Sequence, residues 1–303
     1  MKYRDIGDVL VPLVTPFRED ESLDYDRLAK TADWILDTGR GDSLIVTGTT
    51  GEFAALSDKE RIQSWGVVMD ACGDRAPIIA GSGAASTRST IMLTQEAERI
   101  GMDMAMVVGP YYQKPTDEGV YRHFVEVAEN TSLPIIVYNI PLFTGVNVSA
   151  DIVRRLMDIP NIVAVKEEAG INPTQSTKLL LNARAREDFV VLDGDDMMAL
   201  PIIAQGASGI VSGGAQVIGA AMKKCVAALK ADDLVTGRDI FMDLFPVFEA
   251  FGGKGRTNPI PGVRAGMALC GMDTGNCRRP LTPFDAEETE ALRKELVRVG
   301  VVS

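Results

Sequence analysis

The sequence is poor in the residues on which many catalytic and structural sites depend. Its 303 residues include one histidine, so any mechanism or metal site that needs two histidines is excluded. His123 falls in a helical pattern with Phe124 and Val127, and we expect a packed or surface residue rather than a catalyst. The four cysteines form no CxxC pair, which is typical of reduced thiols and not of a disulfide framework.

Basic charge and long apolar runs are scarce as well. Lys and Arg number 31 against 42 Asp and Glu, for a formal net charge of −11. This balance argues against a nucleic-acid partner, because such binding depends on Lys and Arg that neutralise phosphates. No window approaches the roughly 18 apolar residues of a membrane helix, and Asp5 and Asp8 interrupt the N-terminal apolar stretch. We expect a cytoplasmic protein with no targeting segment and no membrane or nucleic-acid partner.

The chain does contain a repeated alternation of short strands and helices. Hydrophobic residues make up 46% of the sequence, as in a packed globular protein. The apolar runs are continuous, which is typical of parallel strands buried on both faces. Amphipathic patterns separate them, and Ser57 with Glu60, Ser149, and Asn172 before Pro173 mark helix starts. The expected strands are Val9–Thr15, Ser43–Val46, Pro77–Ala80, Met104–Val108, Pro134–Tyr138, Ile162–Lys166, Val190–Asp193 and Gly209–Val211.

Eight strands that alternate with helices, at roughly 30 residues per unit, predict an α/β protein with a (β/α)8 TIM barrel. The alternative is an open doubly wound sheet. We assign residues 1–230 to the barrel and residues 231–303 to a C-terminal helical extension packed on it, as a single structural unit. The expected helical segments of this extension are Asp232–Phe251, Asn258–Cys270 and Asp285–Val299.

The most informative residue near the predicted barrel mouth is Lys166. In this fold the active site lies at the C-terminal ends of the strands, and Lys166 ends the apolar run of residues 162–165. Burial among apolar side chains favours the neutral amine, and a neutral amine attacks a ketone to form a Schiff base. The alternative is a lysine at a strand end whose amine reaches water.

Tyr138 and two threonines add to this interpretation. Tyr138 ends the neighbouring strand, where its phenol either carries protons or is a rim aromatic with a solvated hydroxyl. Thr49 and Thr50 lie between Gly48 and Gly51, so backbone N–H groups and hydroxyls are available there to a small carboxylate. The same four residues also fit a tight turn in which the hydroxyls bond local backbone.

Other motifs that suggest cofactors do not fit. The glycines of residues 81–83 and 252–255 match neither a dinucleotide loop nor a Walker loop. Asp193, Asp195 and Asp196 suggest a divalent metal, but we expect Asp195 or Asp196 to cap the next helix. Met197 and Met198 are expected in the core. The sequence thus predicts neither a metal nor a cofactor.

Six short motifs occur along the chain, and together they are far more specific than any one of them. They are Gly48-Thr49-Thr50-Gly51-Glu52, Pro110-Tyr111-Tyr112, Tyr138-Asn139-Ile140-Pro141, Val165-Lys166-Glu167, Gly194-Asp195-Asp196 and Asn258-Pro259-Ile260-Pro261. In this order and spacing they resemble the dihydrodipicolinate synthase / N-acetylneuraminate lyase family. The resemblance runs from Val9 to about Phe284.

This resemblance implies a class I aldolase on a β/α barrel with a C-terminal helical extension. It implies that Lys166 forms the Schiff base with pyruvate or a related 2-oxo acid, and that Tyr138 moves protons. Thr49 would link Tyr138 to Tyr112, which the neighbouring subunit would contribute in a homotetramer built from tight dimers. The substrate-binding positions that the resemblance implies are Thr50, Gly48, Gly194, Val211 and, as a residue that changes specificity, Phe143.

Two departures from the family pattern concern the substrate and regulation. Dihydrodipicolinate synthases carry an arginine two residues after the proline of the YNxP motif, which binds the carboxylate of the second substrate, and Phe143 stands there. A phenyl ring cannot replace a planar bidentate donor. The histidines of the family's lysine feedback site are replaced by Asp58 and Arg61, and its Asn and Glu by Ala85 and Ser89, so we expect no feedback by lysine.

The sequence therefore predicts a Schiff-base-forming lyase of pyruvate or another 2-oxo acid that condenses with, or releases, an aldehyde. The motifs around Thr49 and Tyr112 favour a dihydrodipicolinate synthase-like reaction, whereas Phe143 favours a 2-keto-3-deoxy sugar-acid aldolase or dehydratase. Further alternatives are a non-catalytic protein that binds a 2-oxo acid and a metal-dependent barrel enzyme. The aldehyde, the direction of flux and the choice between dimer and tetramer stay open.

Overall fold

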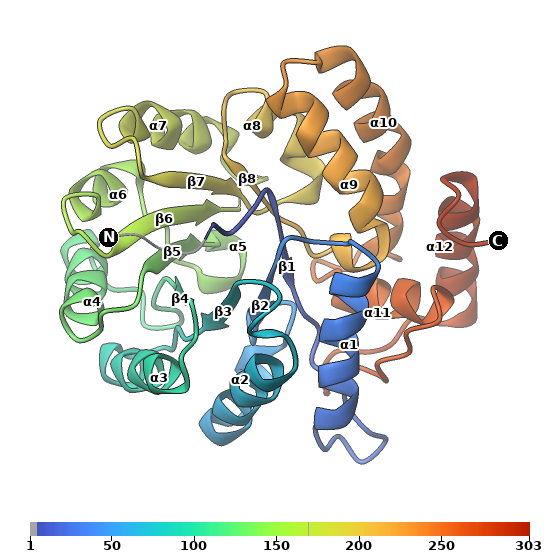
Figure 1. The fold of residues 1–303 in the computed structure, drawn as a ribbon, viewed down its shortest axis with the longest axis horizontal. Helices are drawn as coiled ribbons and strands as arrows, with labels where there is room; N and C mark the ends of the chain where they lie inside the picture. The colour runs from blue at the N-terminus through green and yellow to red at the C-terminus, as the bar shows by residue number, and fades with distance from the viewer. Residues whose placement is uncertain (1–4, 169) are drawn as a thin grey trace.

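The computed structural model describes residues 5–168 and 170–303. Eight parallel strands close into a barrel in which each strand pairs with the next along the chain and β8 pairs with β1 (Figure 1). The predicted (β/α)8 TIM barrel is confirmed, and the open doubly wound sheet was the wrong alternative. The strands are β1 Val9–Pro12, β2 Ser43–Val46, β3 Ile78–Gly81, β4 Met104–Val108, β5 Ile135–Asn139, β6 Ile162–Glu167, β7 Val190–Asp193 and β8 Gly209–Val211.

The largest difference from the predicted strand bounds is in β1. The sequence predicts a strand up to Thr15, but the strand ends at Pro12. Leu13 still donates its N–H to the Ile45 carbonyl of β2 at 2.9 Å, but the Val14 N–H donates to the side chain of Gln216 at 2.9 Å, so from Val14 the backbone bonds to a helix residue instead of a strand. The other strands agree with the prediction to within one residue at either end, and β6 continues one residue beyond Lys166.

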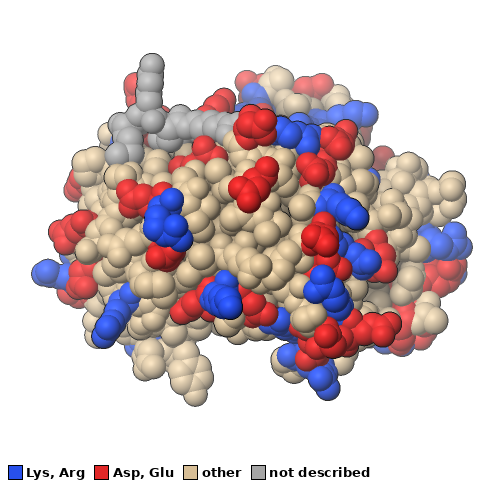
Figure 2. Space-filling model, turned by 60° about the horizontal axis from the view of Figure 1, so that its bottom comes forward, with Lys and Arg blue, Asp and Glu red and all other residues tan. Residues whose placement is uncertain are grey.

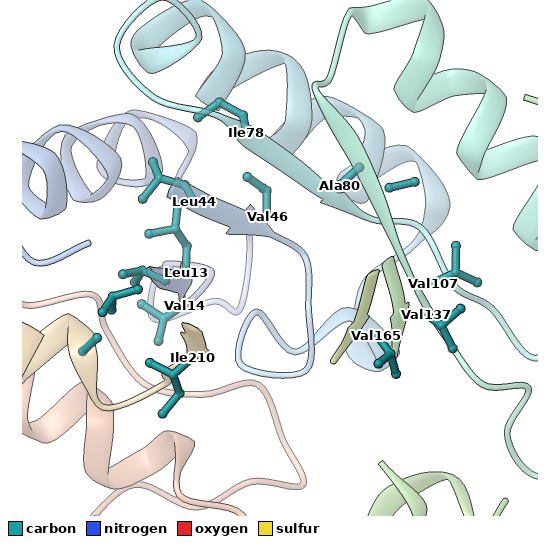
Figure 3. Close-up of a cluster of buried hydrophobic side chains, with 14 of the residues drawn as sticks. Leu13, Val14, Leu44, Val46, Ile78, Ala80, Val107, Val137, Val165 and Ile210 are labelled. Atoms are coloured by element: carbon teal, nitrogen blue, oxygen red, sulfur yellow. The ribbon is translucent and has the colours of Figure 1, made fainter. Parts of the chain in front are cut away.

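Successive residues of each strand face opposite sides of the barrel wall. Figure 3 shows side chains of the outer set, which pack between the strands and the surrounding helices, among them Leu44, Val46, Ile78, Val107, Val137 and Val165. The inner set fills the barrel and includes Leu10, Ile45, Ile79, Ile136 and Leu192. Tyr138 belongs to the inner set, and Lys166 follows the inner residue Ala164 by two positions, so both side chains lie on the inner face.

A ring of helices surrounds the barrel, and several begin where the sequence predicts. Ser57 and Glu60 form a complete capping box, and the Ser149 side chain accepts the N–H of Ile152 at 3.3 Å. The helices before the C-terminal segment are α1 Tyr25–Asp37, α2 Asp58–Cys72, α3 Thr87–Ile100, α4 Asp117–Glu129, the short α5 Pro141–Thr144, α6 Ala150–Leu156, α7 Pro173–Ala183, α8 Ala199–Ile203 and α9 Ala215–Lys230.

Three further helices, drawn in orange and red in Figure 1, lie beside α9 and α1. They are α10 Leu234–Phe251, α11 Ile260–Leu269 and α12 Ala286–Arg298, as the predicted helical segments require. Arg264 of α11 forms a buried ion pair with Glu52, in the loop after β2, at 2.6 Å. The extension is therefore bonded to the barrel mouth. The division into a barrel of residues 1–230 and an extension of residues 231–303 stays a prediction. Residues 1–4 of the predicted barrel lie outside the described part of the chain.

The surface agrees with the charge balance of the sequence. Figure 2 shows acidic and basic side chains interspersed over one face of the molecule, without a continuous basic area on that face. Within residues 5–168 and 170–303, no helix has the length and apolar character that a membrane crossing requires.

Candidate active site

Lys166 and Tyr138 meet at the C-terminal ends of two adjacent strands. The two residues are register partners across β5 and β6, and both face the interior of the barrel. Lys166 is 5% exposed and Tyr138 is 2% exposed. The Lys166 Nζ atom lies 3.9 Å from the centre of the Tyr138 ring. The barrel register therefore sets an amine and a phenol next to each other in a buried position.

Thr49 completes this corner of the site. Its Oγ1 lies 3.2 Å from the Tyr138 hydroxyl, within hydrogen-bond distance, and either oxygen can be the donor. The loop that carries Thr49 is held on both sides. Before Thr49, the backbone of Thr47 has a left-handed φ of 57°, and the Thr47 hydroxyl accepts the Trp65 indole N–H at 2.8 Å. After Thr49, Glu52 forms an ion pair with Arg264.

A cavity of ≈ 350 Å³ opens above Lys166 and gathers most of the predicted residues. Those that line it are Lys166, Tyr138, Thr49, Thr50, Gly194, Val211 and Phe143. Gly48 does not line this cavity; it lines a much smaller one of ≈ 10 Å³ behind Thr49. Tyr112 lines neither, because its side chain is 87% exposed on a loop where its own φ is 73°.

Gly194 is needed for the close approach of β7 to Lys166. A Cβ atom at position 194 would lie 2.7 Å from Cε of Lys166 and 3.0 Å from the carbonyl oxygen of Glu167. Real Cβ atoms do not approach so closely, so a side chain at this position would displace the lysine. The Gly194 N–H donates to the same Glu167 carbonyl at 2.8 Å, which holds the turn after β7 against β6.

Glu167 lies on the outer face of the barrel, behind the lysine. Both of its carboxylate oxygens accept from Nδ2 of Asn139, at 3.1 and 3.0 Å, and one accepts from Nε2 of Gln175 at 3.1 Å. These donors are neutral amides and the carboxyl is buried, so burial raises the pKa of Glu167 to about 7. This network ties β5 to β6 next to the Tyr138–Lys166 pair.

Sequence reasoning did not place the carboxylates of the cavity among the site residues, although it named Asp195 and Asp196 as helix caps and as part of a family motif. Glu168, Asp195 and Asp196 line it, and burial raises the pKa of all three, to about 6 for Asp196. Asp195 also caps the following turn as predicted, because its side chain accepts the N–H of Met197 at 3.0 Å. Within the described residues no group of three potential ligands is arranged to hold a metal ion.

The prediction that Met197 belongs to the core is wrong. Met197 is 38% exposed and lines the cavity, because it lies in the turn after β7 and not in a regular helix face. The segment before α11 was also missed as a contributor, since Arg256 and Asn258 line the cavity from the C-terminal extension. The sequence signal that could have identified this segment as part of the site is the NPIP motif that begins at Asn258. Helix periodicity cannot show that this segment folds back over the barrel mouth.

His123 is packed, as the sequence predicts. It is 3% exposed on α4, and its Nδ1 lies 3.0 Å from the Thr87 hydroxyl. Burial lowers its pKa to about 4, so the ring is neutral at physiological pH. It does not line the cavity that contains Lys166.

Comparison with known proteins identifies relatives that match over nearly the whole chain. The sequence profile described as "Dihydrodipicolinate synthetase family" matches residues 5–298. The chain is 42% identical over 296 residues to the 4-hydroxy-tetrahydrodipicolinate synthase of Moorella thermoacetica, covering 98% of this chain and 99% of that one. It is 40% identical over 294 residues to the enzyme of the same name from Desulforamulus reducens, covering 95% and 96%.

A solved structure gives the same result for the fold. The chloride-inhibited dihydrodipicolinate synthase of Acinetobacter baumannii, solved in complex with pyruvate, superposes with a TM-score of 0.90. The two sequences are 34% identical, and the match covers 98% of this chain and 100% of the other. The likeness therefore extends to the barrel and the C-terminal helices together.

Proposed function

The chain belongs to the dihydrodipicolinate synthetase family and is a lyase that acts on 2-oxo acids through a Schiff base, and we propose that Lys166 forms that Schiff base with pyruvate or a related 2-oxo acid. The observation that carries this proposal is the position of Lys166 in the 350 Å³ cavity. Its amine lies 3.9 Å from the ring of Tyr138, with Thr49 bonded to the phenol. The cavity thus brings together an amine, a proton carrier and enough space for a small substrate.

In the proposed mechanism the neutral amine of Lys166 attacks the ketone carbon and forms a carbinolamine. Tyr138 gives its proton to the carbinolamine hydroxyl, which leaves as water as the nitrogen forms the C=N bond. The iminium then acts as an electron sink, so that the Tyr138 phenolate takes a proton from C3 and an enamine forms. The enamine attacks an aldehyde, or in the reverse direction an aldehyde is released.

Thr50 is the proposed contact of the substrate carboxylate. It lines the cavity, and the loop around it offers backbone N–H groups and a hydroxyl, which suit a small anion. Gly48 supports this loop from the smaller cavity behind it. Gly194 and Val211 line the same cavity.

We further propose that Tyr112 acts in the site of a neighbouring subunit. Its 87% exposure is unusual for a tyrosine, and within the described chain its hydroxyl is not bonded to Thr49. An exposed ring beside the mouth of one subunit suits insertion into another, in a homotetramer assembled as a dimer of dimers. A cytoplasmic location belongs to the same proposal and is supported by the free cysteines.

A second candidate function, a 2-keto-3-deoxy sugar-acid aldolase or dehydratase, is favoured by the outer half of the cavity, which is the part formed by Phe143, Met197 and the segment 256–258. Phe143 stands there in place of a cation, and Glu168 and Asp195 line the same cavity. Arg256 also lines this half, but its guanidinium is bound to Glu288 at 2.8 Å and to the Thr282 carbonyl. Hydroxyl groups of a sugar acid suit these carboxylate acceptors. A second carboxylate would find, among the described lining residues, only Lys166, which the Schiff base uses, and Arg256, which is already bound.

Borohydride reduction tests the proposed lysine. With pyruvate, intact-mass analysis of the reduced protein should show one adduct per chain, in the presence or absence of a chelator. Lys166→Ala should abolish the adduct, and Lys178→Ala, an exposed lysine of α7, should retain it. An adduct that survives Lys166→Ala overturns the assignment.

A panel of aldehydes then separates the two candidate reactions. Turnover of pyruvate with aspartate semialdehyde should be compared with turnover with glyceraldehyde and with cleavage of a 2-keto-3-deoxy sugar acid. A strong rate with aspartate semialdehyde alone excludes the second candidate, and a strong rate with the hydroxylated substrates alone supports it.

A further inference from the structure

Arg61 is a buried cation that the proposed reaction does not use. It lies on α2 and is 3% exposed, and within residues 5–168 and 170–303 no carboxylate forms an ion pair with it. A guanidinium buried without an anion is destabilising, because the energy of desolvation is not offset by an ion pair. Buried charges of this kind near a cavity are candidates for a role in function.

Part of the Arg61 guanidinium has a structural role. Its Nη2 donates to the carbonyl oxygens of Gly81 and Gly83, at 2.5 and 3.0 Å, just after β3. Its Cζ lies 5.3 Å from the ring centre of Phe53 and 6.0 Å from that of Trp65. Nε, in contrast, is buried and has no acceptor among the described residues. The structural bonds use Nη2 alone, so they do not account for the position of Nε.

A small chamber separates Arg61 from the reacting groups. It has a volume of ≈ 10 Å³ and is lined by Arg61 on one side and by Thr49 and Tyr138 on another. A chamber of about 10–15 Å³ is the smallest that holds a water molecule, and a buried water needs two to four polar partners. The unpartnered Nε–H and the Thr49–Tyr138 pair are polar groups of the required kind.

We propose that this chamber holds one ordered water, which accepts the Nε–H of Arg61 and donates to the Thr49–Tyr138 pair. Arg61 is then a positioning residue that acts on proton transfer through the water, within a single subunit. The inference rests on the proposed function, because it assigns the role to the Schiff-base reaction of Lys166.

The chemical step shows why a fixed cation is useful there. When Tyr138 protonates the leaving hydroxyl, the carbinolamine C–O bond breaks, the lysine nitrogen forms the C=N bond, and a phenolate remains. The Thr49 hydroxyl donates to this phenolate, and the chamber water donates to Thr49 in turn. The nearby guanidinium stabilises the negative charge until the phenolate takes the proton from C3. Tyr111 and Asp58 are the titratable groups whose charge acts on Arg61.

The test compares Arg61→Met, Arg61→Lys and a matched structural control. Ser64→Ala removes a buried side-chain hydrogen bond on the same helix, to the carbonyl oxygen of Glu60, without a change of charge, and Ser64 lines neither cavity. For each variant, the rate of borohydride-trapped adduct formation with pyruvate is measured from pH 6 to 10, together with the melting temperature. Arg61→Met should slow adduct formation by about tenfold or more and should shift the alkaline limb of the pH profile upwards by about one unit.

The conservative and control variants decide between a positioning and a structural role. Arg61→Lys retains the charge and should keep the alkaline limb within about 0.3 unit of its normal position, and Ser64→Ala should lower only the melting temperature. If Arg61→Met lowers the melting temperature and leaves the rate and the pH profile unchanged, Arg61 is structural and the inference is wrong. If Arg61→Met does not fold, a high-resolution crystal structure of the unmodified protein decides: a chamber with no water density overturns the inference.

Failure of this inference can be distinguished from failure of the proposed function. If the unmodified protein forms no adduct with pyruvate, the Schiff-base assignment of Lys166 fails. If it forms the adduct and Arg61→Met forms it at the same rate, the role of Lys166 stands and the role of Arg61 fails.

Discussion

The inner and outer halves of the cavity are built in different ways. The inner half is made by strand ends, where Lys166 and Tyr138 are 5% and 2% exposed and Gly194 allows close contact. The outer half is made by turns and by the C-terminal extension, where Phe143 and Met197 are 42% and 38% exposed. Barrel register fixes side chains in the inner half, whereas loop sequence sets the outer half. We therefore assign the Schiff-base reaction to the inner half and the choice of substrate to the outer half.

The departures from the family pattern follow the same division. Residues of the inner half match the family motifs, from Thr49 to Lys166, so the chemistry of the Schiff base is retained. Phe143, which departs from the pattern, lies in the outer half and has space around it. A change there alters which aldehyde fits, without disturbing the lysine. Four substitutions test whether the two halves are as independent as their construction suggests.

The largest effect is expected from Tyr138→Phe in the inner half. Loss of the phenol removes the proton carrier but keeps the ring beside Lys166, so turnover should fall on the order of 10²-fold or more. The readouts are kcat and the rate of borohydride-trapped adduct formation, with the melting temperature as the test of folding. Phe143→Leu is the outer-half control and should leave adduct formation with pyruvate unchanged. An unchanged rate in Tyr138→Phe removes Tyr138 from the proton path.

Gly194→Ala should have the next largest effect. The added Cβ would lie 2.7 Å from Cε of Lys166, and the displaced amine should react with pyruvate more slowly, on the order of tenfold or more. Gly66→Ala on α2 is the control for an added methyl group, because its Cβ would meet no atom within 4 Å and Gly66 does not line the cavity. Equal rates of adduct formation in both variants would show that close contact in the inner half does not position the lysine.

Phe143→Arg tests the outer half alone. The new cation should improve kcat/KM for aldehydes that carry a carboxylate, by on the order of tenfold relative to glyceraldehyde, because it supplies a bidentate partner. Adduct formation with pyruvate should not change, since Phe143 does not contact Lys166 in the inner half. Phe143→Met is the uncharged control. A loss of the pyruvate adduct in Phe143→Arg would show that the two halves are coupled.

The smallest effect concerns stability, through Glu167 behind the inner half. Because its pKa is raised to about 7 by burial, the folded state favours the protonated carboxyl. Its contribution to stability is present below the unfolded value of about 4.5 and is lost as pH rises through about 7. The melting temperature of the unmodified protein should therefore decrease over this range relative to Glu167→Gln.

Neighbouring carboxyls also affect how stability changes with pH. The measurement is therefore the difference in melting temperature between the unmodified protein and Glu167→Gln at each pH. Glu168, Asp193, Asp195 and Asp196 also have raised pKa values, so they contribute with the same sign in both proteins. Thermal melts of both proteins at pH 5, 6, 7 and 8 give the required difference. A constant difference across these pH values would mean that Glu167 is ionised throughout.

Much of this molecule could be predicted from local patterns. The eight strands, the capped starts of α2 and α6, and the strand-end positions of Lys166 and Tyr138 follow from apolar runs, capping residues and the barrel rule. These signals are local, because a strand or a helix start depends on residues a few positions apart. The resemblance to a known family added the roles that spacing alone left open.

Other features depend on contacts between distant segments. Met197 was predicted in the core but lines the cavity, and nothing in its local pattern shows that the turn after β7 faces the barrel mouth. The approach of Arg256 and Asn258 requires the C-terminal extension to fold back over the mouth. The orientation of Arg61 toward the chamber behind Tyr138 depends on how α2 packs against β2 and β3.

The barrel and the positions of Tyr138 and Lys166 at the ends of neighbouring strands could be predicted from the sequence. The presence of a single histidine also excluded every mechanism that needs two. The tertiary structure was needed to show that Tyr112 is exposed, that carboxylates line the cavity, and that Arg61 is buried without an ion pair among the described residues. The reason is physical. Periodicity and capping act over a few residues, whereas closure of the barrel brings together loops that are far apart in the chain.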